Sequence, residues 1–180
     1  MKFDFSFDKK KLNSWLLYLG IIALGIIFDQ VTKSLAVEFL SLNRKPSKTV
    51  NIIGDFLRLR YAENTGMAFS LFSGRPWLLG IISGGCVLLG WRILRRFRLG
   101  RLSRAAAMLM LGGALGNMID RLLRGYVIDM FEVLLFDFAV FNVADAALTV
   151  GAVLMAGALL FCDEDWRGKH AGSKSDHPGS

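Results

Sequence analysis

Residues 112–145, GGALGNMIDRLLRGYVIDMFEVLLFDFAVFNVAD, decide the fold, because they join two strongly apolar segments and yet carry several ionisable side chains. The polar residues of this stretch include Asn117, Asp120, Arg121, Asp129, Asn142 and Asp145. Ionisable groups at membrane depth cost roughly 2.5–3.5 kcal/mol each on insertion scales, so membrane proteins keep them mainly where they act or are paired. A reversal of the chain between the apolar segments would bring Asp129 and Asp145 together. The stretch therefore predicts acid–base chemistry shared by two carboxylates.

The composition places the chain among membrane proteins. Its 180 residues are enough for about one domain, and 53% of them are hydrophobic. The net charge of +7 could suggest a nucleic-acid partner. The basic residues flank apolar segments, however, and no RNA-binding or zinc motif is present, so membrane topology explains the charge better and no nucleic acid is expected. Cys86 and Cys162 lie in apolar runs without a CxxC neighbour, which predicts structural burial, with no metal site and no cofactor.

The first apolar segment covers residues 15–28 and follows a polar, lysine-containing N-terminus. A cleavable signal peptide is an alternative, because residues 34–36, SLA, weakly resemble a cleavage site. Apolar character resumes over 31–40, which favours a retained first membrane helix. Asp29 and Lys33 are four residues apart, so they share a helical face as a possible ion pair. The pair could be structural, or it could contact a substrate.

Residues 41–76 are expected outside the membrane. Within them, residues 57–61, LRLRY, alternate apolar and polar side chains, the period of a half-buried strand. Residues 63–66, ENTG, are typical of a turn. Asn64 could therefore be a turn former or a functional amide.

Three further membrane helices are predicted at about 77–94, 105–123 and 141–161. The glycines of the third segment would let a neighbouring helix approach closely. Residues 124–140 turn back with mixed character. Residues 163–180 are polar and rich in Gly and Ser, which predicts a disordered tail after a single membrane domain at 1–162.

Charge sets the expected orientation. An arginine-rich cluster at 92–104 separates the second and third segments, and such a cluster marks a cytoplasmic loop. Four spans then place both termini in the cytoplasm. The outer ends of the first, third and fourth spans carry Asp29, Asp120, Asp129 and Asp145. The conspicuous polar groups therefore collect near one face of the membrane.

Two neighbouring carboxylates cannot both ionise readily, so they titrate as a pair. One then acts as a general base on water while the other, protonated, polarises a carbonyl, as in aspartic proteases. His170 and His177 lie in the tail, which leaves no Ser/His or Cys/His alternative. Nearby Asn amides could bind a peptide, and Arg121 could hold an acid such as Asp120 or orient the site.

Five motifs in this order resemble the lipoprotein signal peptidases (signal peptidase II) over about residues 12–162. They are Asp29-Gln30 with Lys33, NTGMAF at 64–69, GNMIDR at 116–121, VIDMF at 127–131 and FNVAD at 141–145. The resemblance implies an all-α membrane bundle of four transmembrane helices with a small extracytoplasmic β-structured lobe. It further implies an aspartic endopeptidase of the bacterial cell (inner) membrane that removes the signal peptide from diacylglyceryl-modified prolipoproteins, cutting N-terminal to the lipidated Cys.

The resemblance also implies roles for individual residues. The catalytic pair would be Asp129 and Asp145; the substrate-binding residues Asn64, Asn117, Arg121 and Asn142; and the supporting residues Asp29, Lys33, Gly66 and Asp120. The implied partners are prolipoprotein signal peptides with a diacylglyceryl-Cys, membrane lipids and cyclic peptide inhibitors of the globomycin type, bound by a monomer.

Two other classes of protein are alternatives to a peptidase. A small proton-coupled transporter would place its acids near the bilayer midplane and often repeat its halves, whereas these acids gather at one end without an internal repeat. A non-catalytic scaffold gives no reason for an Asp pair beside polar Asn groups.

Overall fold

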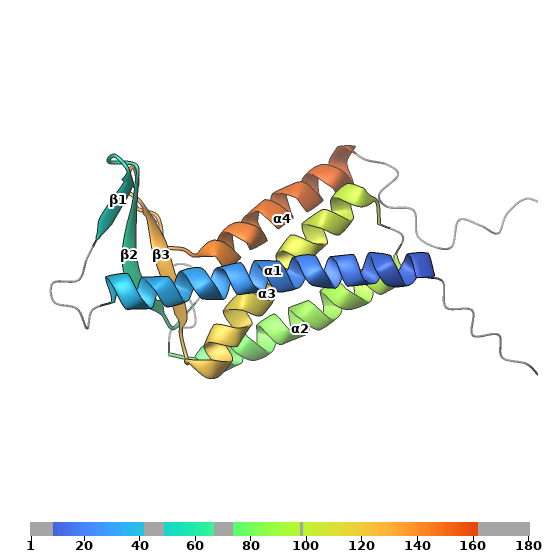
Figure 1. Ribbon diagram of the computed structural model, residues 1–180, viewed down its shortest axis with the longest axis horizontal. Helices are drawn as coiled ribbons and strands as arrows, with labels where there is room; N and C mark the ends of the chain where they lie inside the picture. Colours follow the sequence, from blue (N-terminus) through green and yellow to red (C-terminus); the bar gives the residue numbers. More distant parts are fainter. Residues whose placement is uncertain (1–8, 42–48, 67–73, 98, 162–180) are drawn as a thin grey trace, which may run out of the picture.

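The computed structural model describes residues 9–41, 49–66, 74–97 and 99–161. Four helices and three strands occupy these residues, in the order α1 (Lys9–Leu40), β1 (Val50–Ile53), β2 (Leu57–Asn64), α2 (Pro76–Arg96), α3 (Arg101–Leu123), β3 (Val127–Val133) and α4 (Val143–Phe161). The small sheet lies at one end of the helix bundle, beside the C-terminal end of α1 (Figure 1). The predicted fold class, four membrane helices with a small β lobe, is confirmed. The loop at 42–48, the end of the NTGMAF motif at 67–69 and the predicted tail lie outside the described residues.

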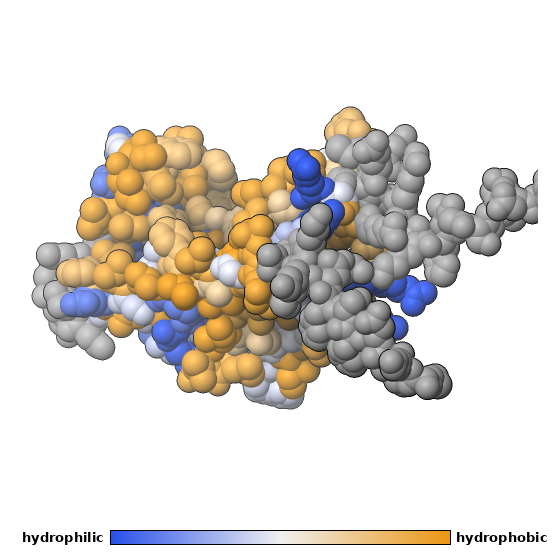
Figure 2. Space-filling view, turned by 45° about the vertical axis from the view of Figure 1, so that its right-hand side comes forward, coloured by the Kyte–Doolittle hydropathy of each residue, from blue (hydrophilic) through white to orange (hydrophobic). Residues whose placement is uncertain are grey.

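All four helices are long and apolar enough to cross a membrane, including the predicted first span at Trp15–Leu40. Their outward faces carry exposed leucines such as Leu24, Leu88 and Leu160, which a bilayer would cover. Figure 2 shows the resulting apolar surface. The predicted burial of Cys86 is wrong, because its side chain is exposed on α2. An apolar run places a residue within a membrane span, but it does not say whether the residue faces protein or lipid. Cys162 lies outside the described residues.

Helix α3 is the centre of the bundle. Half of its most apolar stretch is buried, against 11% in α1 and 17% in α2 and α4. Glycines make this possible: a Cβ added at Gly113 would lie 2.4 Å from the Ala144 carbonyl oxygen, and one at Gly151 would lie 2.8 Å from that of Ala106. Helices α3 and α4 therefore approach to backbone contact, as the small residues of α3 predict.

The sheet is antiparallel, with β2 between β1 and β3. The predicted strand at 57–61 is confirmed and extends to Asn64. Strand β3 was not predicted, because its first four residues are all buried and so show none of the alternation of a half-exposed strand. Its residues Ile128 and Met130 pack with Ala36 and Leu40 at the end of α1, which attaches the sheet to the bundle.

A glycine turn carries the chain from α3 into β3. Helix α3 ends with the backbone N–H of Arg124 donating to the Asp120 carbonyl oxygen. Gly125 follows with φ of 78°, a left-handed conformation that glycine adopts without a Cβ clash. The resulting reversal directs Asp129 back toward the bundle end.

Candidate active site

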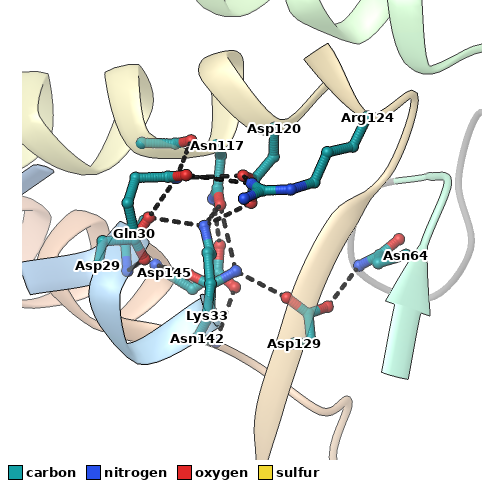
Figure 3. A network of polar contacts seen from close by, with 12 residues as sticks. Asp29, Gln30, Lys33, Asn64, Asn117, Asp120, Arg124, Asp129, Asn142 and Asp145 are labelled. Atoms are coloured by element: carbon teal, nitrogen blue, oxygen red, sulfur yellow. Dashed lines mark hydrogen bonds and ion pairs between the residues drawn. The ribbon is translucent and has the colours of Figure 1, made fainter. Parts of the chain in front are cut away.

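A buried polar cluster lies where α1, α3, α4 and β3 meet (Figure 3). Six residues of the cluster are at most 5% exposed: Asp29, Lys33, Asn117, Asp120, Asp129 and Asn142. They come from distant parts of the chain and sit at the sheet end of the bundle. Burial of so many polar groups requires that they satisfy one another.

Asn142 and Asp145 form the N-terminal cap of α4. The Asp145 N–H donates to Asn142 Oδ1 at 2.9 Å, and the Asn142 N–H donates to Asp145 Oδ2 at 3.1 Å. This reciprocal arrangement is a capping box, which satisfies N–H groups that the first helical turn leaves free. Just before it, Phe141 exchanges backbone hydrogen bonds of 2.8 and 3.0 Å with Phe131 of β3. The start of α4 is thereby held against the strand that carries Asp129.

Two amides connect the two acids. Asn142 Nδ2 donates to Asp129 Oδ1 at 2.7 Å and to Asn117 Oδ1 at 3.1 Å. Asn117 Nδ2 donates to Asp145 Oδ1 at 2.7 Å. Asp129 and Asp145 are therefore neighbours around shared amide partners, although 16 positions of sequence numbering separate them.

The other oxygen of Asp129 accepts a hydrogen bond from the sheet. Asn64 Nδ2, at the end of β2, donates to Asp129 Oδ2 at 3.0 Å. Asn64 Oδ1 accepts from the Gly66 N–H at 2.9 Å, so the same side chain also forms the local turn. Arg121 Nη2 then donates to the Gly66 carbonyl oxygen at 3.0 Å. Both interpretations of Asn64, a turn former and a functional amide, are therefore compatible.

The protonation of Asp129 is set by its surroundings. Burial, together with the negative charge of Asp145, raises the pKa of the Asp129 carboxyl to about 7. Hydrogen bonds from Asn64 and Asn142 and the charge of Lys33 act in the opposite direction. Near neutral pH the carboxyl therefore exchanges its proton readily, which suits general acid–base catalysis.

The expected ion pair between Asp29 and Lys33 is present. Lys33 Nζ lies 2.7 Å from Asp29 Oδ2 and 2.8 Å from Asp120 Oδ2. Asp29 Oδ1 accepts the Ala144 N–H at 3.0 Å, which adds a further bond at the start of α4. A Cβ at Gly116 would lie 2.7 Å from Asp29 Oδ2, so the close contact depends on glycine. Lys33 is fully buried, so its ammonium group is in contact with protein groups and closed to solvent.

Two members of the cluster were not assigned a role from the sequence. Gln30 Nε2 donates to Asp120 Oδ1 at 3.1 Å, and Arg124 Nη1 donates to Gln30 Oε1 at 3.1 Å and pairs with Asp120. The four-residue spacing of Asp120 and Arg124 was the signal that could have found the latter. Asp120 is thus held by Lys33, Gln30 and Arg124. Arg121, the partner that the sequence suggests for Asp120, donates to the Gly66 carbonyl oxygen instead.

The site offers hydrogen bonds and acid groups. Among the described residues, no group of three or more His, Cys, Asp or Glu side chains is placed to hold a metal ion. What the arrangement supplies is a carboxyl pair, four amide or guanidinium side chains around it and a low-dielectric setting. These groups can transfer protons to and from a bound carbonyl and a water molecule.

Comparisons with known proteins show which family this chain resembles. Residues 21–161 match the family model described as signal peptidase (SPase) II. The chain is 39% identical over 145 residues to a lipoprotein signal peptidase of Lactococcus lactis subsp. cremoris (strain MG1363), covering 81% of this chain and 94% of that one. It is 38% identical over 151 residues to one from Mycobacterium leprae (strain Br4923), covering 81% and 72%.

A solved structure described as a bacterial membrane enzyme, determined by the in meso method at 2.3 Å resolution, has the same fold. It superposes with a TM-score of 0.72 at 31% identity, over 80% of this chain and 87% of the other. A second such structure, at 1.9 Å resolution, gives a TM-score of 0.71 at 31% identity, over 81% and 94%. The chain therefore belongs to the signal peptidase II family, the lipoprotein signal peptidases, and is a multi-pass bacterial membrane protease.

Proposed function

We propose that the protein is an intramembrane aspartic endopeptidase that removes signal peptides from diacylglyceryl-modified prolipoproteins, cutting N-terminal to the lipidated Cys. The observation that carries this proposal is the pairing of Asp129 and Asp145 around Asn142 in a buried site. Paired carboxyls, one of which has a raised pKa as Asp129 has, are what water-mediated peptide hydrolysis requires.

The two acids take different parts in the reaction. Asp145 removes a proton from a water molecule, whose oxygen attacks the scissile carbonyl carbon. Asp129 gives its proton to the carbonyl oxygen, which yields a tetrahedral diol. The diol collapses as Asp129 takes back a hydroxyl proton and Asp145 passes its proton to the departing amine of the lipidated Cys. Each carboxyl ends in its starting state.

The surrounding polar residues divide by what they touch. Asn117 and Asn142 are nearly or fully buried and donate to the acids, so they hold the pair in place. Asn64 and Arg121 lie toward the sheet. The Nε of Arg121 is buried and has no hydrogen-bond partner among the residues that the structure describes. A substrate carbonyl is a suitable acceptor for that donor. A cyclic peptide inhibitor of the globomycin type would compete for the same groups.

The site lies at the outer end of the bundle. The sheet lies at the end of the bundle opposite the C-terminal end of α2 and the N-terminal end of α3 (Figure 1). The polar cluster includes Asp129 of the sheet and therefore lies at the sheet end. Arg95 and Arg96 end α2 and Arg101 begins α3, and positive charge favours the cytoplasmic side. Both termini are then cytoplasmic, and the lipidated substrate enters with its acyl chains in the bilayer.

The proposal is tested with purified protein in detergent and a lipidated precursor peptide. We expect the wild-type protein to release a fragment that begins with the diacylglyceryl-Cys, identified by mass spectrometry. Asp129→Asn and Asp145→Asn should each abolish cleavage. Asp137→Asn is the control, because Asp137 is an exposed carboxylate of the same lobe and should leave cleavage unchanged. Turnover retained by either site variant would refute the assignment.

A further inference from the structure

We infer that Lys33 is a positioning residue, which orients the Asn117 amide so that its N–H group faces Asp145 and which fixes a positive charge behind the carboxyl pair. No step of the proposed reaction uses Lys33. Lys33 is linked to the catalytic carboxyl of Asp145 only through the amide of Asn117. The inference deepens the proposed aspartic mechanism and rests on it.

The first support is the burial of Lys33. Lysine is almost never fully buried unless it is paired, and Lys33 is 0% exposed. Its ammonium group lies 2.7 Å from Asp29 Oδ2 and 2.8 Å from Asp120 Oδ2, and it donates to Asn117 Oδ1 at 3.1 Å. These three partners match the three donors of the group. Asp29 and Asp120 balance the charge of Lys33, and the Asn117 amide connects Lys33 to Asp145.

The second support is the direction of the Asn117 amide. Its oxygen accepts from both Lys33 Nζ and Asn142 Nδ2, each at 3.1 Å. Its nitrogen donates to Asp145 Oδ1 at 2.7 Å. A flipped amide would direct its N–H group at two donors and its oxygen at a carboxylate, with repulsion at both ends. Because lysine has no acceptor, Lys33 permits only the direction that serves Asp145.

The third support is the distribution of charge around Lys33. The charged groups that face it are Asp29 on its own helix, Asp120 and Arg124 on α3, Asp129 on β3 and Asp145 on α4, with Arg121 beside the pair. The positive charge of Lys33 lowers the pKa of Asp129. Loss of that charge should therefore move the titration of the pair, and with it both limbs of the pH–rate profile, to higher pH.

The single variant Lys33→Met removes the ion-pair partner of Asp29, while Asp120 keeps Arg124, and a buried carboxylate without its partner is strongly destabilising. The double variant Lys33→Met with Asp29→Asn avoids this, because the acid that remains, Asp120, keeps its pair with Arg124. The matched control is Asp29→Asn alone, which keeps Lys33 with Asp120 and its bond to Asn117. The double variant and its control then differ only in Lys33.

The experiment compares kcat, KM and the pH profile of cleavage of a lipidated precursor by the folded wild-type, control and double-variant proteins. We expect the double variant to lose at least about tenfold in kcat relative to the control, with KM little changed. Its profile should lie about 0.5–1 pH unit above that of the control. A folded double variant with the kcat and pH profile of the control would overturn the inference.

Failure of the proposed function has a different signature. It would appear as absence of cleavage by the wild-type protein, before any variant is compared. A merely structural role of Lys33 would lower the melting temperature or the yield of the double variant, but it would leave the pH limbs of the folded fraction where the control has them.

Discussion

The protonation of Asp129 makes the stability of the protein depend on pH. Burial, with the charge of Asp145, raises the pKa of this carboxyl to about 7. In the unfolded chain an aspartate titrates at about 3.9. The difference of roughly three pKa units corresponds to about 4 kcal/mol of linked free energy. The residue is only 2% exposed, so solvent screening removes little of this effect.

The sign follows from which state holds the proton. Below pH 4 both states are protonated and the contribution to stability is fully present. As the pH rises toward 7, the unfolded chain releases its proton while the folded protein retains it, so stability falls. Between pH 5 and pH 8 the wild-type protein should lose about 2.5 kcal/mol of unfolding free energy through this group.

Asp129→Asn removes the titration. Its unfolding free energy should lack this fall between pH 5 and pH 8. The new amide can still accept from Asn142, but its N–H group then faces the Asn64 donor, a pH-independent loss of about 1 kcal/mol. The variant should therefore be close to wild type in stability at pH 5 and clearly more stable than wild type at pH 8.

The assay is reversible unfolding of the purified protein in mixed micelles at both pH values, measured by far-UV circular dichroism. Asp55→Asn is the control, because Asp55 is exposed in the turn between β1 and β2 and the variant should keep the pH dependence of the wild type. Parallel curves for the wild type and Asp129→Asn would refute the reasoning, since they would show that Asp129 titrates alike in the folded and unfolded states.

Three further predictions follow from contacts in the bundle. Gly113→Ala should destabilise the protein by about 1–3 kcal/mol. Gly157→Ala, whose added Cβ meets nothing within 4 Å among the described residues, should stabilise it by about 0.5–1 kcal/mol; equal effects in a thermal melt would contradict the tight contact of α3 and α4. Asn142→Ser keeps a capping oxygen, so it should retain about 1 kcal/mol of unfolding free energy that Asn142→Ala loses. Both variants lose the amide bond to Asp129 and should cut precursor cleavage at least about tenfold; a fully active Ser variant would show that the amide is dispensable. Asn64→Ala removes a hydrogen bond that lowers the pKa of Asp129, so the high-pH limb of cleavage should move up by about 0.5–1 unit, and a downward move would oppose this account.

Much of the site could be predicted because a polar residue in an apolar segment is a strong signal. Asp29 and Lys33 form the ion pair that their spacing predicts. Asp129 and Asp145 converge as the chain reversal after α3 requires. In both cases the membrane excludes solvent as an alternative partner, so the polar groups must find one another.

The parts that could not be predicted depend on three-dimensional contacts. Strand β3 is buried on both faces at its start, so its sequence shows no strand period. Arg121 reaches a backbone carbonyl at Gly66 rather than a neighbouring acid. Cys86 faces outward on α2, because apolar side chains occur on both the protein and the lipid side of a membrane helix.

The central claim is that Asp129 and Asp145 work as one catalytic unit, and a double-mutant cycle on single-turnover cleavage tests it most directly. Residues that act as a unit are strongly non-additive. We predict that multiple turnover is abolished in both single variants, and that the residual single-turnover rate of the combined Asp129→Asn and Asp145→Asn variant is no lower than theirs. A combined loss equal to the product of the two single losses, or a single variant with the wild-type rate, would contradict the account.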